Sequence, residues 1–224
     1  MQGIKKEEIG AISVITKYSV EFVDNIVNHI IKDLGLTVIH LNYPITYNKN
    51  LIPPPERFAE KLINVFENII SKYPYVRVRP LTEFLLSLLA GNSFSVCYQY
   101  DGCYAGMAML AFDTQGNIYP CPELITIAKY RLGNVKQIKD PKHVISKVKI
   151  FRSSRCNMVV QSNLRKILPG KGLGCVAFDE RLGIHLQEEL YLHLATKVLS
   201  EIVNNVSFRQ NLEKYLALTL ERYL

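Results

Sequence analysis

The sequence predicts an α/β segment with parallel strands, followed by an α+β domain that has a β-hairpin and C-terminal helices. Three observations predict this class. Residues 9–44 read as strand, helix and strand. A turn sequence at 113–116 lies between two apolar runs. In the last part of the chain, apolar residues recur at the spacing of an α-helix. We place a boundary near residues 90–95, giving domains 1–92 and 93–224.

The first strand is expected at 11–17 and the second at 36–44, with a helix between them. The run 11–17 is apolar and rich in β-branched residues, which is typical of a buried strand. Ser19 is a suitable N-cap for the helix and Gly35 a suitable C′ residue. The expected inward face of this helix comprises Phe22, Ile26, Ile30 and Leu34, widened by Val23, Val27 and Ile31. A βαβ unit of this kind has parallel strands.

Two more helices complete the first domain. The helix from Pro55 is amphipathic, and its expected inward residues are Phe58, Leu62, Val65, Phe66 and Ile69. A further helix is expected over 79–92, capped at Thr82 and ended by Gly91. Two parallel strands with helices on one side cannot bury both faces of their sheet, so the strand at 11–17 needs a neighbour. We therefore expect this domain to be part of a larger α/β barrel or sheet.

The second domain is expected to open on a hairpin, with "DTQG" as its turn and Cys121 at the far end of its second strand. A glycine-rich loop, "PGKGLGC", ends at Cys175. Helices follow at 186–203 and after Ser207, which is a suitable N-cap.

Composition indicates a globular protein of 224 residues, with 48% apolar residues and a net charge of +7. No apolar run reaches the length of a membrane span and no signal peptide is visible, so a cytoplasmic location is the default expectation. The basic residues concentrate only at 134–155. A solvated face explains this segment better than a nucleic-acid patch, and attraction of an acidic peptide is a minor alternative.

The five cysteines are spaced C-x5-C-x17-C-x34-C-x18-C. Three of them surround the predicted hairpin, and in a cytoplasmic protein such clustering indicates metal or redox chemistry. Four thiolates from separate loops suit tetrahedral zinc or an iron–sulfur cluster. Zinc sites usually contain C-x2-C pairs, which this chain lacks. Isolated buried cysteines are the third interpretation, and the residues alone leave it open.

The other candidate residues are weaker. The histidines form no spaced ligand set: they are His29, His40, His143, His185 and His193. His193 is expected to be packed or on the surface, Asp113 to be a turn residue, and Glu188 and Glu189 to belong to a solvated helix face. Four tyrosines lie near the cysteines, where packing explains them better than substrate binding or an electron path: they are Tyr98, Tyr100, Tyr104 and Tyr119.

The element C103-x12-G116-x4-C121 resembles the opening motif of the SPASM domain of radical SAM enzymes, as found in anaerobic sulfatase-maturating enzymes. In its fuller form that motif has another cysteine six positions earlier, where this chain has Cys97. The segment "RLGNV" and the glycine-rich end at Cys175 also resemble the family. The resemblance covers roughly residues 93–200.

This resemblance implies that Cys97, Cys103, Cys121 and Cys175 are the ligands of one auxiliary [4Fe–4S] cluster. It implies no second cluster, because Cys156 has Val159 at its C-x2-C partner position. Cys156 is then expected to be a buried or incidental thiol. The expected fold is a partial radical SAM barrel segment followed by a SPASM/twitch-like iron–sulfur domain.

Residues 10–45 are similar to the fifth strand, fifth helix and sixth strand of the radical SAM partial barrel. The catalytic CxxxCxxC motif is absent, so this chain should not cleave S-adenosylmethionine alone. The resemblance implies the C-terminal portion of a maturase acting on a ribosomal peptide or protein, with its cluster serving electron relay or structure. S-Adenosylmethionine would bind only if a missing N-terminal half completed the barrel. A second chain, or a homodimer, would cover the open edge. The alternatives are a non-catalytic cluster- or peptide-binding module and a zinc-stabilised structural domain.

Overall fold

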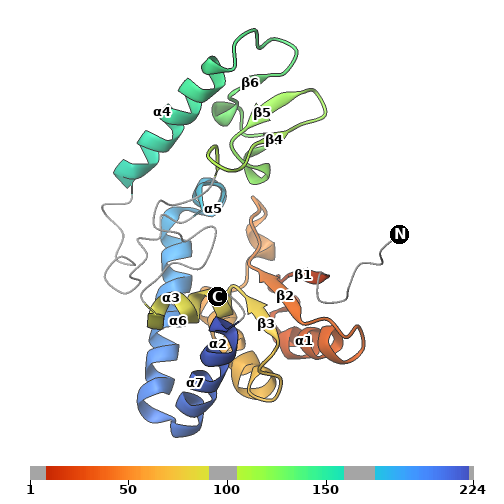
Figure 1. Ribbon diagram of the computed structural model, residues 1–224, viewed down its shortest axis with the longest axis vertical. Helices are drawn as coiled ribbons and strands as arrows, with labels where there is room; N and C mark the ends of the chain where they lie inside the picture. Colours follow the sequence, from red (N-terminus) through yellow and green to blue (C-terminus); the bar gives the residue numbers. More distant parts are fainter. Residues whose placement is uncertain (1–8, 91–104, 159–174, 222–224) are drawn as a thin grey trace.

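The computed structural model describes residues 9–90, 105–158 and 175–221. Its strands and helices are β1 (Gly10–Val14), α1 (Val23–Lys32), β2 (Val38–Asn42), α2 (Pro55–Val65), β3 (Arg77–Arg79), α3 (Leu81–Ala90), β4 (Ala111–Phe112), β5 (Asn117–Tyr119), β6 (Gly133–Asn134), α4 (Lys142–Met158), α5 (Val176–Leu182), α6 (Ile184–Asn204) and α7 (Val206–Leu220). β4, β5, β6 and α4 form one end of the molecule, and the sheet β1–β3 lies towards the other with α1 and α2 (Figure 1). Among the described residues, no helix is long and apolar enough to cross a membrane.

The first sheet has three parallel strands in the order β1-β2-β3. The parallel pairing of β1 with β2 confirms the βαβ prediction, with Ile12 opposite His40 and Val14 opposite Asn42. The third strand was missed. It is only Arg77–Arg79, it alternates charged and apolar residues, and it directly precedes the proline that leads into α3. Its register places His40 opposite Arg79.

The two faces of this sheet differ sharply. Because side chains alternate along a strand and parallel partners point the same way, Ile39, Leu41 and Val78 share one face. All three are fully buried in the main core together with residues of α1 and α2. Ile12 and Val14 share the opposite face with His40, Asn42 and Arg79. There Ile12 is 69% and Val14 56% exposed, so the prediction of a buried first strand was wrong on this face.

The helices that cover the apolar face follow the sequence pattern with one correction. In α2 and the π-helical turn Phe66–Ile70 that continues it, all five predicted inward residues are buried. In α1 the buried residues are Val23, Val27, Ile30 and Ile31, whereas Phe22 and Leu34 are exposed. The buried residues all belong to the predicted inward face, whereas Phe22 and Leu34 lie outside the α-helix, Phe22 in the 3-10 turn Val20–Phe22 and Leu34 after Lys32.

α6 and α7 pack in the same core as α2. Phe66 contacts Phe208 and Tyr215 of α7 at centroid distances of 4.9 and 5.6 Å. Leu190, Leu194 and Val198 of α6 are buried in that core.

Two predicted caps were wrong: the side chain of Asn205, rather than Ser207, accepts the amide hydrogen of Phe208. Thr82 lies inside α3, where its hydroxyl bonds to the backbone of Val78. The division at residues 92 and 93 stays a prediction.

The predicted hairpin is confirmed. β4 and β5 pair antiparallel, and β6 adds a third strand beside β5. Gly116 has a φ of 83°, which glycine adopts without strain. The Asp113 carboxylate accepts hydrogen bonds from the Asn117 side chain and from the amides of Gln115 and Asn117, and these bonds lower its pKa. Asp113 is thus a turn residue, as predicted.

A buried hydroxyl pair joins α7 to the start of α3. Tyr215 and Thr82 are 2.6 Å apart through their hydroxyl oxygens, and burial is the main cause that raises the pKa of Tyr215 to about 12. We expect Tyr215→Phe to lower the free energy of unfolding by about 1 kcal/mol at neutral pH. A raised phenol pKa gives stability that is lost as pH rises, so the advantage of the wild type over the variant should shrink above pH 10 and reverse before pH 12. Urea unfolding across this range measures it.

The matched control is Tyr18→Phe, because the Tyr18 side chain is 66% exposed. Its unfolding free energy should equal that of the wild type at every pH. A Tyr215→Phe variant as stable as the wild type at neutral pH would contradict the role of the hydroxyl pair.

Candidate functional site

A pocket of about 550 Å³ lies at the carboxyl ends of the three parallel strands. Ligands of α/β proteins commonly bind at this edge of a parallel sheet. The residues that line it are Val14, Thr16, His40, Leu41, Asn42, Tyr43, Pro44, Ile45, Thr46, Leu51, Phe58, Arg79, Pro80, Glu83, Glu123, Cys175, Phe178, Leu190 and Tyr191. The wall is mostly apolar, and its charged residues are Arg79 of β3, Glu83 of α3 and Glu123. That composition is typical of a site for an organic ligand.

The charged groups of the pocket centre on Glu83. Its side chain is only 1% exposed, and Oε1 pairs with Arg79 and, at 2.9 Å, with Nη2 of Arg77. Among the described residues, Glu83 Oε2 has no hydrogen-bond partner. Burial, together with the positive charges of Arg79 and Arg77, lowers the pKa of His40. The imidazole on this face is therefore held neutral beside an ion pair.

Tyr43 forms the apolar side of the pocket. Its hydroxyl donates a hydrogen bond to the carbonyl oxygen of Pro53, and its ring stacks on Phe178 at 5.7 Å. Burial is the main cause that raises the pKa of Tyr43, with Glu189 and Glu56 adding negative charge. Because Phe178 belongs to α5, this contact brings the segment after Cys175 against the end of β2.

Two of the four predicted cluster ligands fall within the described residues. Cys121 is 8% exposed and starts the 3-10 turn Pro122–Leu124. Cys175 is partly buried and occupies the N-cap position of α5. Cys121 belongs to one small hydrophobic cluster, together with Ala105, Leu124, Phe151, Val176 and Ala177. Cys175 packs against this cluster and also against the main core. Cys97 and Cys103 lie outside the described residues, as do Tyr98, Tyr100 and Tyr104. Cys156 lies on α4, and its side chain is not described.

Arg181 joins the segments that follow the two described cysteines. Its guanidinium donates to the Glu123 carbonyl oxygen at 2.6 Å and to the Glu123 carboxylate at 3.2 Å. It also donates to the Ile45 carbonyl oxygen at 3.4 Å, and it lies over the ring of Tyr47. One side chain therefore connects α5, the turn after Cys121 and the loop after β2. All three segments contribute residues to the lining of the pocket.

The sequence did not single out Arg79, Glu83 or Arg181. The first two had a usable signal, because "VRVRP" alternates like a strand and Glu83 lies four residues after Arg79. Arg181 had none, since its partners come from distant segments. His40 was considered only as a metal ligand, whereas the structure places it on the pocket face of β2.

Comparisons with known proteins find a likeness in structure only. No protein family matches the sequence, and no curated protein does. The fold resembles part of anSMEcpe, an anaerobic sulfatase-maturating enzyme of the radical SAM/SPASM group, solved with bound AdoMet. The TM-score is 0.58 at 17% identity, covering 87% of this chain and 56% of that one. A structure of anSMEcpe with AdoMet and the Kp18Cys peptide gives 0.57 at 18% identity, covering 87% and 57%.

This chain therefore spans less than two thirds of the length of the structures it resembles. At such identity the likeness concerns the fold. It confirms the coarser part of the fold prediction, a mixed α/β chain that resembles part of a radical SAM maturase.

Glu83 gives a direct test of the pocket's charge balance. We expect Glu83→Gln to lower the free energy of unfolding by about 2 kcal/mol, because two arginines lose their buried counter-charge. The cost stays below that of a fully buried pair, since Arg77 and Arg79 remain 32% and 27% exposed. Glu60→Gln is the control, as its pair with Arg57 is at the surface and should change stability by less than about 0.5 kcal/mol. Equal urea midpoints for the two variants would show that Glu83 does not stabilise the protein as the counter-charge of the two arginines.

Proposed function

We propose that this chain binds one [4Fe–4S] cluster through Cys97, Cys103, Cys121 and Cys175, as the C-terminal portion of a radical SAM maturase that acts on a ribosomal peptide or protein. The observation that carries the proposal is the position of Cys121 and Cys175, which are distant in sequence: Cys121 belongs to one small hydrophobic cluster and Cys175 packs against it. The likeness of the fold to anSMEcpe supports it independently of the cysteine spacing.

The described surroundings of Cys121 and Cys175 fit an iron–sulfur cluster. Thiolates are the usual ligands of such clusters, and an apolar environment with low solvent exposure tunes their reduction potential. Cys121 is buried, and its neighbours in the hydrophobic cluster are aliphatic or aromatic. A cluster held by four thiolates has no open iron, so it would supply electron relay or structural support. The four cysteines would fix the position of the cluster in the chain.

The pocket is the proposed place for the substrate. Cys175 and Glu123 line it, so a cluster on Cys175 would border the bound molecule. The structures of anSMEcpe include complexes with peptides, and an extended peptide suits an apolar cleft with few charged groups. Arg79 lines the pocket, and its partly exposed guanidinium suits a carboxylate of the bound molecule.

The outer edge of β1 is the proposed contact for a further strand. Within the described residues β1 pairs only with β2, and Ile12 and Val14 expose apolar surface beside this edge. Open edges of parallel sheets are normally paired or covered. A second chain carrying the front of the barrel, or a second copy of this chain, would cover it. We assign S-adenosylmethionine only to an assembly that includes the missing barrel strands.

Anaerobic reconstitution with iron and sulfide tests the cluster. We expect about four irons and four sulfides per chain, and loss of most of both in Cys121→Ser and Cys175→Ser. Cys156→Ser is the matched control and should keep the wild-type content. Zinc bound without sulfide would establish the structural zinc alternative instead, and equal iron in Cys121→Ser and wild type would refute the assigned ligand set.

Arg181 should control how firmly the cluster is held. Removing its bonds to Glu123 and Ile45 in Arg181→Ala frees the turn after Cys121 from α5, so a chelator should extract iron several-fold faster than from the wild type. The initial iron content should be unchanged, because no thiolate is lost. Arg209→Ala on the exposed face of α7 is the control. Unchanged extraction in Arg181→Ala would show that the two segments are held together by packing alone.

A further inference from the structure

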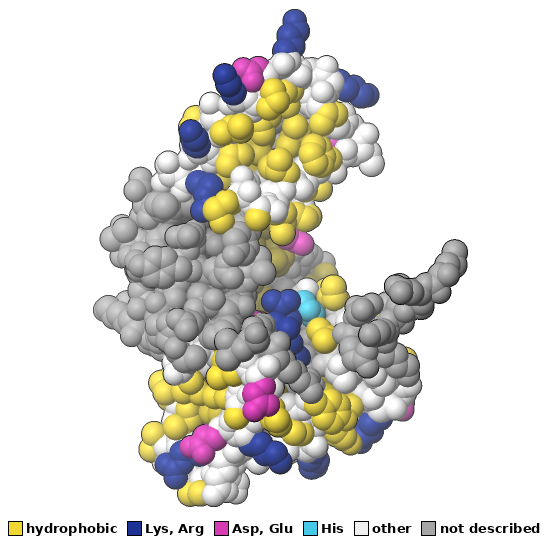
Figure 2. Space-filling view, viewed as in Figure 1, with side chains coloured by type: hydrophobic (Ala, Val, Ile, Leu, Met, Phe, Trp, Pro, Cys, Tyr) yellow, Lys and Arg dark blue, Asp and Glu magenta, His cyan; other side chains and the backbone are white. Residues whose placement is uncertain are grey.

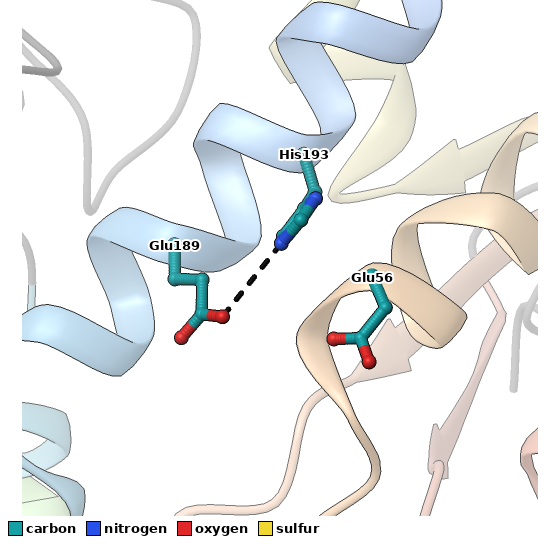
Figure 3. Close-up of side chains that lie close together, drawn as sticks. All are labelled: Glu56, Glu189 and His193. Atoms are coloured by element: carbon teal, nitrogen blue, oxygen red, sulfur yellow. Dashed lines mark ion pairs between the residues drawn. The ribbon is translucent and has the colours of Figure 1, made fainter.

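Three side chains of types that can bind a metal ion lie close together where α2 and α6 pack against each other. Glu56 lies in the first turn of α2, while Glu189 and His193 lie one turn apart on α6. Figure 3 shows the three side chains directed into the space between the two helices. One ligand atom from each lies within 4.8 Å of the other two, and His193 Nε2 is 3.7 Å from Glu189 Oε1.

Buried contacts fix the helices that present these groups. Phe58 and Leu62 of α2 share the main core with Leu190 and Leu194 of α6. Glu189 and His193 are separated by four residues, so they lie on one face of the helix. The three ligand side chains are at the rim of this packed interface and are exposed or half-exposed. Their backbones are therefore held in place while the side chains can adjust.

The charges at this rim are compatible with a bound cation. Two carboxylates approach one histidine, and in the described part of the chain no lysine or arginine forms an ion pair with Glu56 or Glu189. Bringing two carboxylates together without a positive partner is unfavourable. A bound divalent cation would turn this repulsion into attraction.

We propose that Glu56, Glu189 and His193 bind one divalent transition-metal ion, with Zn²⁺ as the best fit. Imidazole and carboxylate ligands suit zinc, and three protein ligands leave a fourth position for water. Bond lengths near 2 Å place ligand atoms about 3.3 Å apart in a tetrahedral site, so the exposed side chains need to close in by at most about 1.5 Å. The bound ion would tie α2 to α6, and it is independent of the cysteines.

The histidine spacing in the sequence predicted no ligand set, with His193 packed or on the surface and Glu189 on a solvated face. Both positions are confirmed, since the side chains of His193 and Glu189 are 42% and 52% exposed. What the structure adds is Glu56, which reaches the pair from another helix. Only the pair E189-x3-H193 is visible in the sequence, and such pairs are common on helix surfaces.

The full chain, titrated with ZnCl2 by calorimetry and analysed for bound metal, tests the site. We expect His193→Ala and Glu56→Gln each to bind one zinc fewer than wild type, or to bind it at least about tenfold more weakly. Zinc held by cysteines adds equally to every variant and cancels in the comparison. The matched control is His29→Ala, which removes another exposed histidine–carboxylate pair on a helix but leaves this site intact. It should bind zinc as the wild type does.

Hydrogen exchange supplies a second readout of the bridge. Zinc should slow amide exchange in α2 and α6 of the wild type and leave both unchanged in Glu56→Gln, whose exposed, isosteric substitution should not disturb folding. Equal zinc stoichiometry and affinity in wild type and both variants would overturn the proposal. So would a loss of the same size in His29→Ala.

Discussion

The arrangement of the molecule depends on the unequal faces of one short parallel sheet. Alternation along β2 sends Ile39 and Leu41 into the core and His40 to the opposite side. The apolar face binds α1 and α2 and so fixes the core to which α6 and α7 add their own apolar faces. The other face receives no such cover within the described residues. It carries His40, Asn42 and Arg79, which line the pocket at the carboxyl ends of the strands.

On that face of the sheet, the positive charge of Arg79 is offset by the carboxylate of Glu83. Arg79 would carry an uncompensated positive charge beside the pocket if Glu83 did not lie at the start of α3. A carboxylate that is almost fully buried is tolerable only because two guanidiniums approach it. The same positive charge helps to keep His40 neutral. The pocket thus combines fixed charges of both signs with a neutral imidazole, which suits a polar organic molecule better than a bare ion.

The sequence predicted those features that follow from a local period or a local turn. The inward face of α2, the parallel pairing of β1 with β2 and the hairpin at Asp113–Gly116 are confirmed for this reason. The predicted helix at α1 was too long, because Phe22 belongs to a 3-10 turn and the α-helix ends at Lys32. β3 was missed because three residues are too few to show a period. Arg181 and Glu56 acquire partners only through tertiary contacts, which no spacing in the sequence contains.

The path of the chain from Cys175 onward explains how the cysteines and the pocket share one scaffold. Cys175 begins α5, and α5 leads through Gly183 directly into α6. α6 is held on α2 by buried leucines, while Phe178 stacks on Tyr43 at the end of β2. Arg181 then reaches from the same short helix to the turn that follows Cys121. Cys175 is therefore positioned by the core of the sheet, and Cys121 is positioned relative to Cys175. A group bound by these thiolates would have its distance to the pocket set by the packing of the main core.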